Sequence, residues 1–213
     1  NIEGSYDVGT NTRSVRMKSK KVSGVFAAGN LYSGEYGGTN MSTMSGSVKF
    51  GRPFTGRPTA MRLYTKYTTG AIDVVGKTKP DGVTQNSTPD RAQIKVVLGD
   101  WDSGIYNGDA TSPVYVSTEY PNEIVDFAVD GAARKAGDKT KGTIAYGTAL
   151  IEGNSTNANN EVIPGPVTIN GQKDSKTYAD YNSWNVITIP IVYYDTKAIP
   201  THIIVSFTAS AWG

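Results

Sequence analysis

The chain has 213 residues, with 21 Lys or Arg and 19 Asp or Glu, so its net charge is +2. No apolar run approaches the roughly 20 residues of a membrane-spanning helix, and the near-balanced charge gives no field that would recruit nucleic acid. The absence of cysteine excludes thiol catalysis, disulfides and thiolate metal sites. Its 24 Gly and 13 Tyr favour strands and turns over helices.

Strand patterns recur along the chain, with turn residues between them. In one of these segments, apolar residues alternate with Arg62, Tyr64 and Lys66, which is the period of a half-buried strand. The segment 123–137 has the composition of a short helix ended by Gly137. The predicted strands are 12–19, 21–29, 46–51, 59–67, 92–100, 112–118, 142–151, 185–194 and 201–210.

Long polar segments separate these strands, at 30–45, 76–91, 103–111 and 152–183. Loops of this length are uncommon in compact domains unless they bind a ligand or are mobile. Short strands joined by polar loops are typical of β-sandwiches. The sequence therefore predicts one all-β domain over residues 1–213, a jelly-roll-like β-sandwich with long polar loops.

The segment FGRPFTGRP at 50–58 places two Arg-Pro pairs five residues apart. Arg52 and Arg57 would suit an anionic ligand, because a guanidinium presents a fork of donors to a carboxylate or phosphate. Alternatively, Pro53 and Pro58 hold an extended segment before a strand, and the arginines have only a structural role. Proline chemistry favours the structural interpretation.

Few catalytic arrangements are compatible with this composition. His202 is the only histidine and opens a predicted strand, so neither a Ser-His-Asp triad nor a histidine zinc site is expected. Glycoside hydrolysis needs only two carboxylates, so the sequence does not exclude it. The acidic candidates for that reaction are Asp100, Asp102, Glu119, Glu123, Asp126 and Asp130.

The segment LGDWDSGIY at 98–106 combines aromatic and acidic side chains at the end of a strand. Trp101 and Tyr106 would stack on a sugar ring while Asp100 and Asp102 accept hydrogen bonds from its hydroxyls. The alternative is that Trp101 is a lid packed over the end of the sandwich. Three more aromatic residues join the candidate ligand-binding set: Trp184, Tyr32 and Tyr36.

Several segments together resemble one family, the putative carbohydrate metabolism domain of surface and secreted proteins of Bacteroides-type bacteria. These segments are TRSVRMKSK, GVFAAGNLYSGEY, FGRPFTGRPTAMRLYTKY, LGDWD and WNVITIPIVYYDTKAIPTHIIVSFTASAWG. The resemblance implies a jelly-roll-like sandwich in a cell-surface protein, lipid-anchored at the outer membrane, or in a secreted one. It also implies a role in glycan handling and polysaccharide utilisation, and it supplies no catalytic residues. Within the family, the Arg-Pro block looks like a structural signature.

The chain departs from the family pattern at both ends. Members of the family usually have a segment before TRSV and continue past Gly213 into a strand with an acidic, VDD-like motif. Related sandwiches often hold a structural calcium in that final strand, so calcium is the one cofactor that the resemblance suggests. A sandwich without an edge strand exposes unpaired backbone groups, which a protein partner would complete.

These observations predict a carbohydrate-binding or glycan-handling domain and favour binding over catalysis. Two alternatives stay open. One is a glycoside hydrolase that uses paired carboxylates. The other is a structural or assembly subunit of a surface complex or appendage.

Overall fold

The structure is a computed structural model, and it describes residues 2–7, 13–22, 25–43, 45–74, 83–101, 108–117, 142–178 and 183–211. Every regular element in these ranges is a strand. The predicted all-β fold is therefore confirmed. The helix expected within 123–137 lies outside the described residues.

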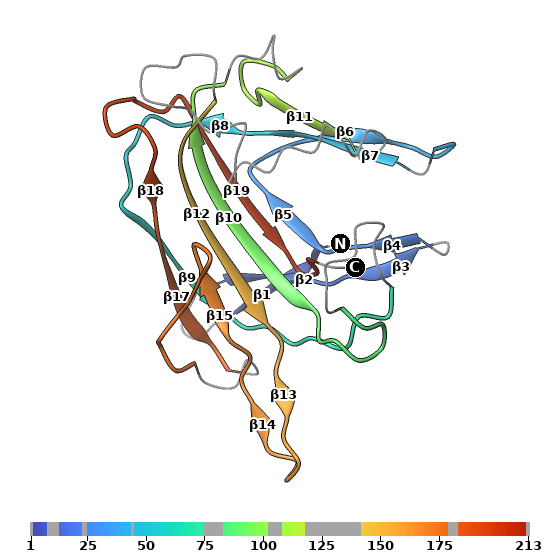
Figure 1. The fold of residues 1–213 in the computed structure, drawn as a ribbon. Helices are drawn as coiled ribbons and strands as arrows, with labels where there is room; N and C mark the ends of the chain where they lie inside the picture. Colours follow the sequence, from blue (N-terminus) through green and yellow to red (C-terminus); the bar gives the residue numbers. More distant parts are fainter. Residues whose placement is uncertain are drawn as a thin grey trace.

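The largest sheet runs through the middle of the molecule and is built around the long strands β10 (Arg91–Gly99) and β12 (Thr143–Glu152) (Figure 1). All of its described pairings are antiparallel. From edge to edge it contains β16 (Gln172–Lys173), β15 (Val167–Ile169), β12, β10, β19 (His202–Thr208) and β5 (Asn30–Tyr32), with β18 (Val192–Tyr193) beside β12 and β8 (Arg52–Pro53) beside β19.

Smaller sheets flank this central sheet (Figure 1). Two of them cover its faces: the pair β9 (Ala60–Thr65) and β17 (Asn185–Pro190), and the sheet of β11 (Val114–Ser117), β7 (Ser45–Phe50) and β6 (Gly34–Asn40). The others are the hairpins β1 (Ile2–Asp7) with β2 (Arg13–Met17), β3 (Lys20–Val22) with β4 (Val25–Ala27), and β13 (Ser155–Thr156) with β14 (Val162–Ile163).

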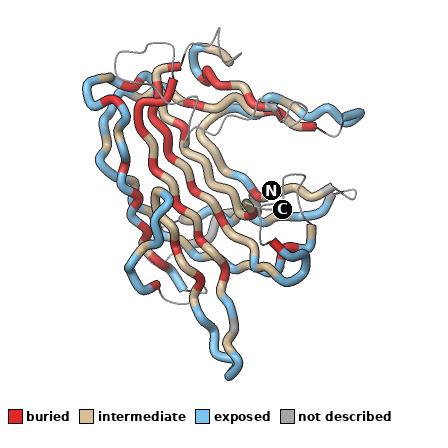
Figure 2. Tube along the Cα trace, in the orientation of Figure 1, coloured by how far each residue is buried: buried red, intermediate tan, exposed pale blue. Residues whose placement is uncertain are grey.

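The side-chain alternation of β10 shows how the layers pack. Ile94 belongs to a buried cluster that includes Ile187 and Ile189 of β17. Val97 points to the opposite face and packs with residues of β11, because successive side chains of a strand face opposite sides of the sheet. Both faces of the central sheet are therefore covered at one end, where Figure 2 shows the buried positions concentrated. This layered packing agrees with the predicted sandwich.

The strand predictions follow the structure closely, with two segments divided. The predicted strand 21–29 contains part of β3 and all of β4, and the predicted strand 185–194 contains β17 and β18. Two polar segments that were expected as loops contain strands instead. Segment 30–45 contains β5 and β6, and segment 152–183 contains β13, β14, β15 and β16. Glycine and polar residues at 34–40 gave no apolar alternation from which β6 could be recognised.

Candidate functional site

Trp101 is part of the core and is not a surface platform. Its side chain is 4% exposed and packs in the cluster of Val97, Val114, Val116 and Ile204. A methyl group added at Gly99 or Gly142 would overlap its indole, so the ring is enclosed by backbone. A sugar cannot stack on a buried ring. The expected sugar platform at Trp101 is therefore wrong, because the sheet of β11 and β7 covers the residue, and the lid interpretation holds.

The residues around Trp101 do not form a described site. Asp100 is half-buried, and its backbone N–H donates to the carbonyl of Gly142 over 2.8 Å. Asp102 and Tyr106 lie outside the described residues. The same is true of the acidic candidates Glu119, Glu123, Asp126 and Asp130.

Both arginines of the Arg-Pro block bind parts of the chain itself. Arg52 forms an ion pair with Glu35 at 3.0 Å and donates to the carbonyl of Gly34 at 2.8 Å. Arg57 donates to the carbonyls of Thr196, at 2.8 Å, and Ala198. Its guanidinium also lies 4.5 Å from the ring centroid of Tyr193. These contacts hold loops against the sheet, so the structural interpretation is confirmed.

Tyr32 and Tyr36 lie near each other where β5 leads into β6. The Tyr32 ring meets Phe50 edge-on, with centroids 5.3 Å apart, and burial together with nearby Tyr36 raises the pKa of Tyr32. Tyr36 is 66% exposed, and its hydroxyl contacts the Thr39 hydroxyl. The structure therefore brings these two predicted residues together, although only Tyr36 presents an open ring.

A second aromatic surface lies on β9 and β17. Their inward side chains, such as Leu63 and Ile187, pack on the core. Their outward side chains are exposed except for Val186, which is half-buried, and Tyr64 among them is 64% exposed. We name this surface the outer face of β9–β17, and its residues are Arg62, Tyr64, Lys66, Trp184, Val186 and Thr188.

The register of the two strands assigns Trp184 to a position diagonal to Tyr64. Trp184 directly precedes β17 and is 43% exposed. Tyr64 pairs with Val186 and Thr65 pairs with Asn185, so the same register extended by one residue sets Trp184 opposite Lys66. Trp184 then occupies the diagonal position to Tyr64, within reach of an aromatic side chain. Of the predicted ligand residues, Trp184 is the one that joins a second exposed ring on a described strand pair.

Sequence reasoning missed Tyr64 as a ligand residue, although its signal was visible. The alternation at 61–66 places Tyr64 on the solvent side of its strand. Its nearness to Trp184 depends on the pairing of β9 with β17, which are separated by about 120 residues of chain. Such a long-range register is not contained in a local pattern.

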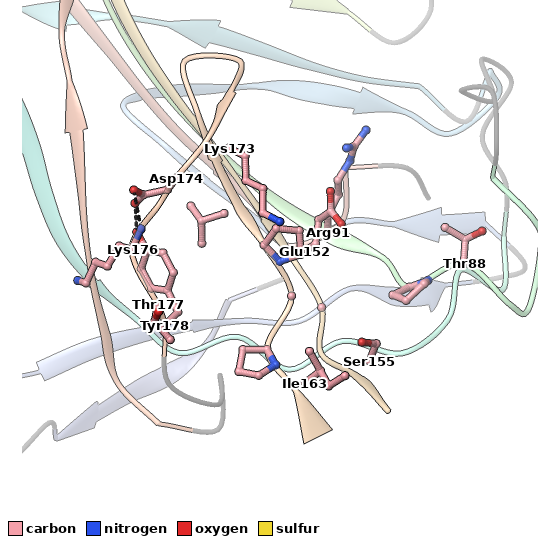
Figure 3. A pocket seen from close by; sticks show the side chains of 16 residues that line it. Thr88, Arg91, Glu152, Ser155, Ile163, Lys173, Asp174, Lys176, Thr177 and Tyr178 are labelled. Atoms are coloured by element: carbon pink, nitrogen blue, oxygen red, sulfur yellow. Dashed lines mark hydrogen bonds between the residues drawn. The ribbon is translucent and has the colours of Figure 1, made fainter. Parts of the chain in front are cut away.

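A pocket of about 560 Å³ holds charged residues of both signs (Figure 3). Figure 3 shows Asp174 and Tyr178 on one side and Glu152 near Arg91 on the other. The charged and aromatic residues that line it are Arg91, Glu152, Lys173, Asp174, Lys176 and Tyr178. Its acids were not among the predicted candidates, because 152–184 was expected to be only a long loop.

Asp174 and Lys176 are held in place by neighbouring groups. The Tyr178 hydroxyl donates to Asp174 Oδ2 over 2.5 Å, and this bond is the main reason that the pKa of Asp174 lies below its ordinary value. Lys176 Nζ lies 5.0 Å from the Tyr178 ring centroid and donates to the carbonyl of Val186 over 2.7 Å. Lys176 therefore links the pocket to the backbone of β17.

The part of the chain that the structure describes contains no group of three His, Cys, Asp or Glu side chains suited to a metal ion. The same residues include no helix long and apolar enough to span a membrane.

A family model described as "Putative carbohydrate metabolism domain" matches residues 3–213. The chain belongs to this family. The resemblance found in the sequence is thereby confirmed at the level of the domain family, which is associated by its description with carbohydrate metabolism. No curated protein and no solved structure matches the chain significantly.

Proposed function

We propose that this member of the carbohydrate metabolism domain family binds a polysaccharide on the outer face of β9–β17. The observation that carries the proposal is the pair of exposed rings, Tyr64 and Trp184, at positions that the register of β9 with β17 makes neighbours. Single exposed apolar side chains are common on proteins. Two large exposed rings at neighbouring positions are more informative. Each ring left in solvent forgoes the roughly 1.5–3 kcal/mol that its burial would contribute to folding.

The chemistry of this face suits a sugar chain. An aromatic ring covers the apolar C–H side of a pyranose, while polar neighbours bond its hydroxyls. Thr188 on β17 and the cations of the same face provide such neighbours. A two-stranded sheet is open at its surface, so a long polymer has access without threading into a closed cavity.

The direct test is isothermal titration of the folded protein against a broad panel of plant and host polysaccharides. Trp184→Ala and Tyr64→Ala should each weaken binding by about 1–3 kcal/mol, the loss usual for aromatic residues at binding hot spots. Tyr36→Ala is the matched control, because this tyrosine is equally exposed but lies on β6. Absence of binding across the panel would refute the proposal. A loss caused by Tyr36→Ala alone would move the site to β6.

A glycoside hydrolase is the second candidate function, and one observation favours it. Glu152 and Asp174 line the same pocket, and this reaction needs two carboxylates around one bond. Against it, the described carboxyl groups with shifted pKa values, Asp73, Asp109 and Asp174, are all shifted downward, whereas a general acid needs a raised pKa. A reducing-end assay on the bound polysaccharides, with Glu152→Gln and Asp174→Asn as controls, decides between binding and turnover.

The cellular setting is also part of the proposal. We place the domain in a lipid-anchored surface protein or a secreted protein of Bacteroides-type bacteria, with a jelly-roll arrangement of its strands, as part of a polysaccharide-utilisation system. The support is the resemblance of its sequence segments to such proteins. Protease treatment of intact cells should remove the protein if it is exposed at the surface, and protection from protease together with absence from the medium would contradict this setting.

A further inference from the structure

The outer face of β9–β17 carries positive charge on both sides of its exposed tyrosine. Arg62 and Lys66 are exposed and lie two residues before and after Tyr64, so each is roughly 7 Å from it along the strand. The outward positions of β9 and β17 contain no acidic residue. The alternation of this strand therefore gives an Arg-Tyr-Lys row on one surface.

These two cations differ from others in the protein. Lys21, Lys49 and Arg52 form ion pairs with Asp73, Asp109 and Glu35, at 2.9–3.0 Å. Within the described ranges, neither Arg62 nor Lys66 has an ion-pair partner. Their charge is consequently open to a ligand.

Lys176 adds a third positive charge at the edge of this face. One of its ammonium donors is used by the carbonyl of Val186, which fixes the group beside β17. An ammonium has three donors, so two remain for another acceptor. Asp174 lies near enough for Lys176 to contribute to its lowered pKa, although the largest contribution comes from the Tyr178 hydroxyl, which donates to Asp174 Oδ2. The charge of Lys176 is therefore partly balanced by this acid.

We propose that the polysaccharide recognised by this face is anionic and carries carboxylate or sulfate groups. Arg62, Lys66 and Lys176 receive these groups while Tyr64 and Trp184 stack on the rings. This inference rests on the proposed function and narrows its ligand class. Arg62 is the strongest of the three cations, since its planar fork of donors matches a carboxylate or sulfate.

The size of the effect follows from solvent exposure. A single exposed ion pair strengthens an interaction by about 1.4- to fivefold, so three of them should raise affinity by about tenfold, within a range of roughly three- to a hundredfold. Salt screens exposed charges, with a Debye length of about 10 Å at 0.1 M. The preference for anionic ligands should therefore shrink as ionic strength rises, whereas stacking on the aromatic rings should persist.

The experiment compares matched ligands that differ only in charge. Polygalacturonate is titrated beside its fully methyl-esterified form, and heparin beside its desulfated and carboxyl-reduced form, each at 50 and 500 mM NaCl. We expect at least one anionic polymer to bind about tenfold more tightly than its neutral counterpart at 50 mM NaCl. Tight binding of polygalacturonate would show that carboxylates suffice, and tight binding of heparin alone would indicate that sulfate is needed. The double variant Arg62→Gln/Lys66→Gln should remove most of this preference. Lys197→Gln, which removes an exposed lysine in the loop after β18, is the charge control.

The outcomes separate this inference from the proposed function. If charged and neutral forms bind equally, and Trp184→Ala weakens both, the face binds glycans but the anionic preference is wrong. If Lys197→Gln reduces the preference as strongly as the double variant Arg62→Gln/Lys66→Gln, the effect comes from overall charge and the inference is also wrong. If no polysaccharide of any kind binds, both proposals fail.

Discussion

Two tryptophans of this protein lie in contrasting surroundings, although the sequence suggested both as sugar-binding residues. Trp101 is 4% exposed and is enclosed by the central sheet, β11 and the backbone at Gly99 and Gly142. Trp184 is 43% exposed, and the outward side chains of the neighbouring strand β9 are exposed as well. The first ring contributes to folding, and the second remains available to a ligand.

The positive charges show the same contrast. Arg52 and Arg57 bind a carboxylate, three backbone carbonyls and an aromatic ring of their own chain. Arg62, only five residues beyond Arg57, faces solvent on β9. Residue type therefore does not distinguish a structural side chain from one that is available to a ligand. The exposure of the side chain and the partners that it has within the chain make that distinction.

The largest expected effect concerns Trp101. Trp101→Ala should lower the free energy of unfolding by about 3–5 kcal/mol, because it removes a large side chain from a closed core. Chemical denaturation followed by fluorescence or circular dichroism measures the loss. Trp184→Ala is the matched control and should change stability by less than about 0.5 kcal/mol, as is usual for surface positions. Equal losses for the two variants would contradict the contrast.

An intermediate effect is expected for Arg57. Arg57→Ala should cost about 1–2 kcal/mol of stability, because two charge-assisted bonds to carbonyls and a cation–π contact are lost from a solvent-exposed site. Arg57→Lys should retain only part of this stability, since an ammonium cannot reproduce the planar fork. Thermal melts of both variants, with Arg62→Ala as control, measure the difference. A loss for Arg62→Ala as large as that for Arg57→Ala would show that Arg62 has a structural role.

The smallest effect concerns the free energy of unfolding at acidic pH. The pKa of Asp174 is lower in the folded protein than its ordinary value of 3.8, chiefly because Tyr178 donates a hydrogen bond. Because the pKa of the Asp174 carboxyl is lower in the folded than in the unfolded protein, its ionised form stabilises the fold. This stabilisation is complete above the unfolded-state pKa and is lost as pH falls through the folded-state pKa. Because this carboxylate is well solvated, the contribution should be below about 1 kcal/mol. Tyr178→Phe should flatten the stability profile below about pH 4, and an unchanged profile would contradict this account.

The sequence predicted the scaffold better than the site. Strict alternation, as in 59–67, revealed most strands, since such a pattern is local. The error at Trp101 arose because a residue in a turn after β10 is covered by β11, whose placement depends on long-range pairing. The diagonal positions of Tyr64 and Trp184 depend in the same way on long-range pairing, through the register of β9 with β17. Contacts between distant segments are not encoded in a short window of residues.

The central claim is that the exposed rings of β9 and β17 bind a polysaccharide without supporting the fold. The most direct measurement is one binding titration and one thermal melt of the double variant Tyr64→Ala/Trp184→Ala beside the unmodified protein. We predict that polysaccharide binding becomes undetectable or at least about thirtyfold weaker, from two losses of about 1–3 kcal/mol each, while the melting temperature stays within about 2 °C. Unchanged affinity in a folded double variant would contradict the account.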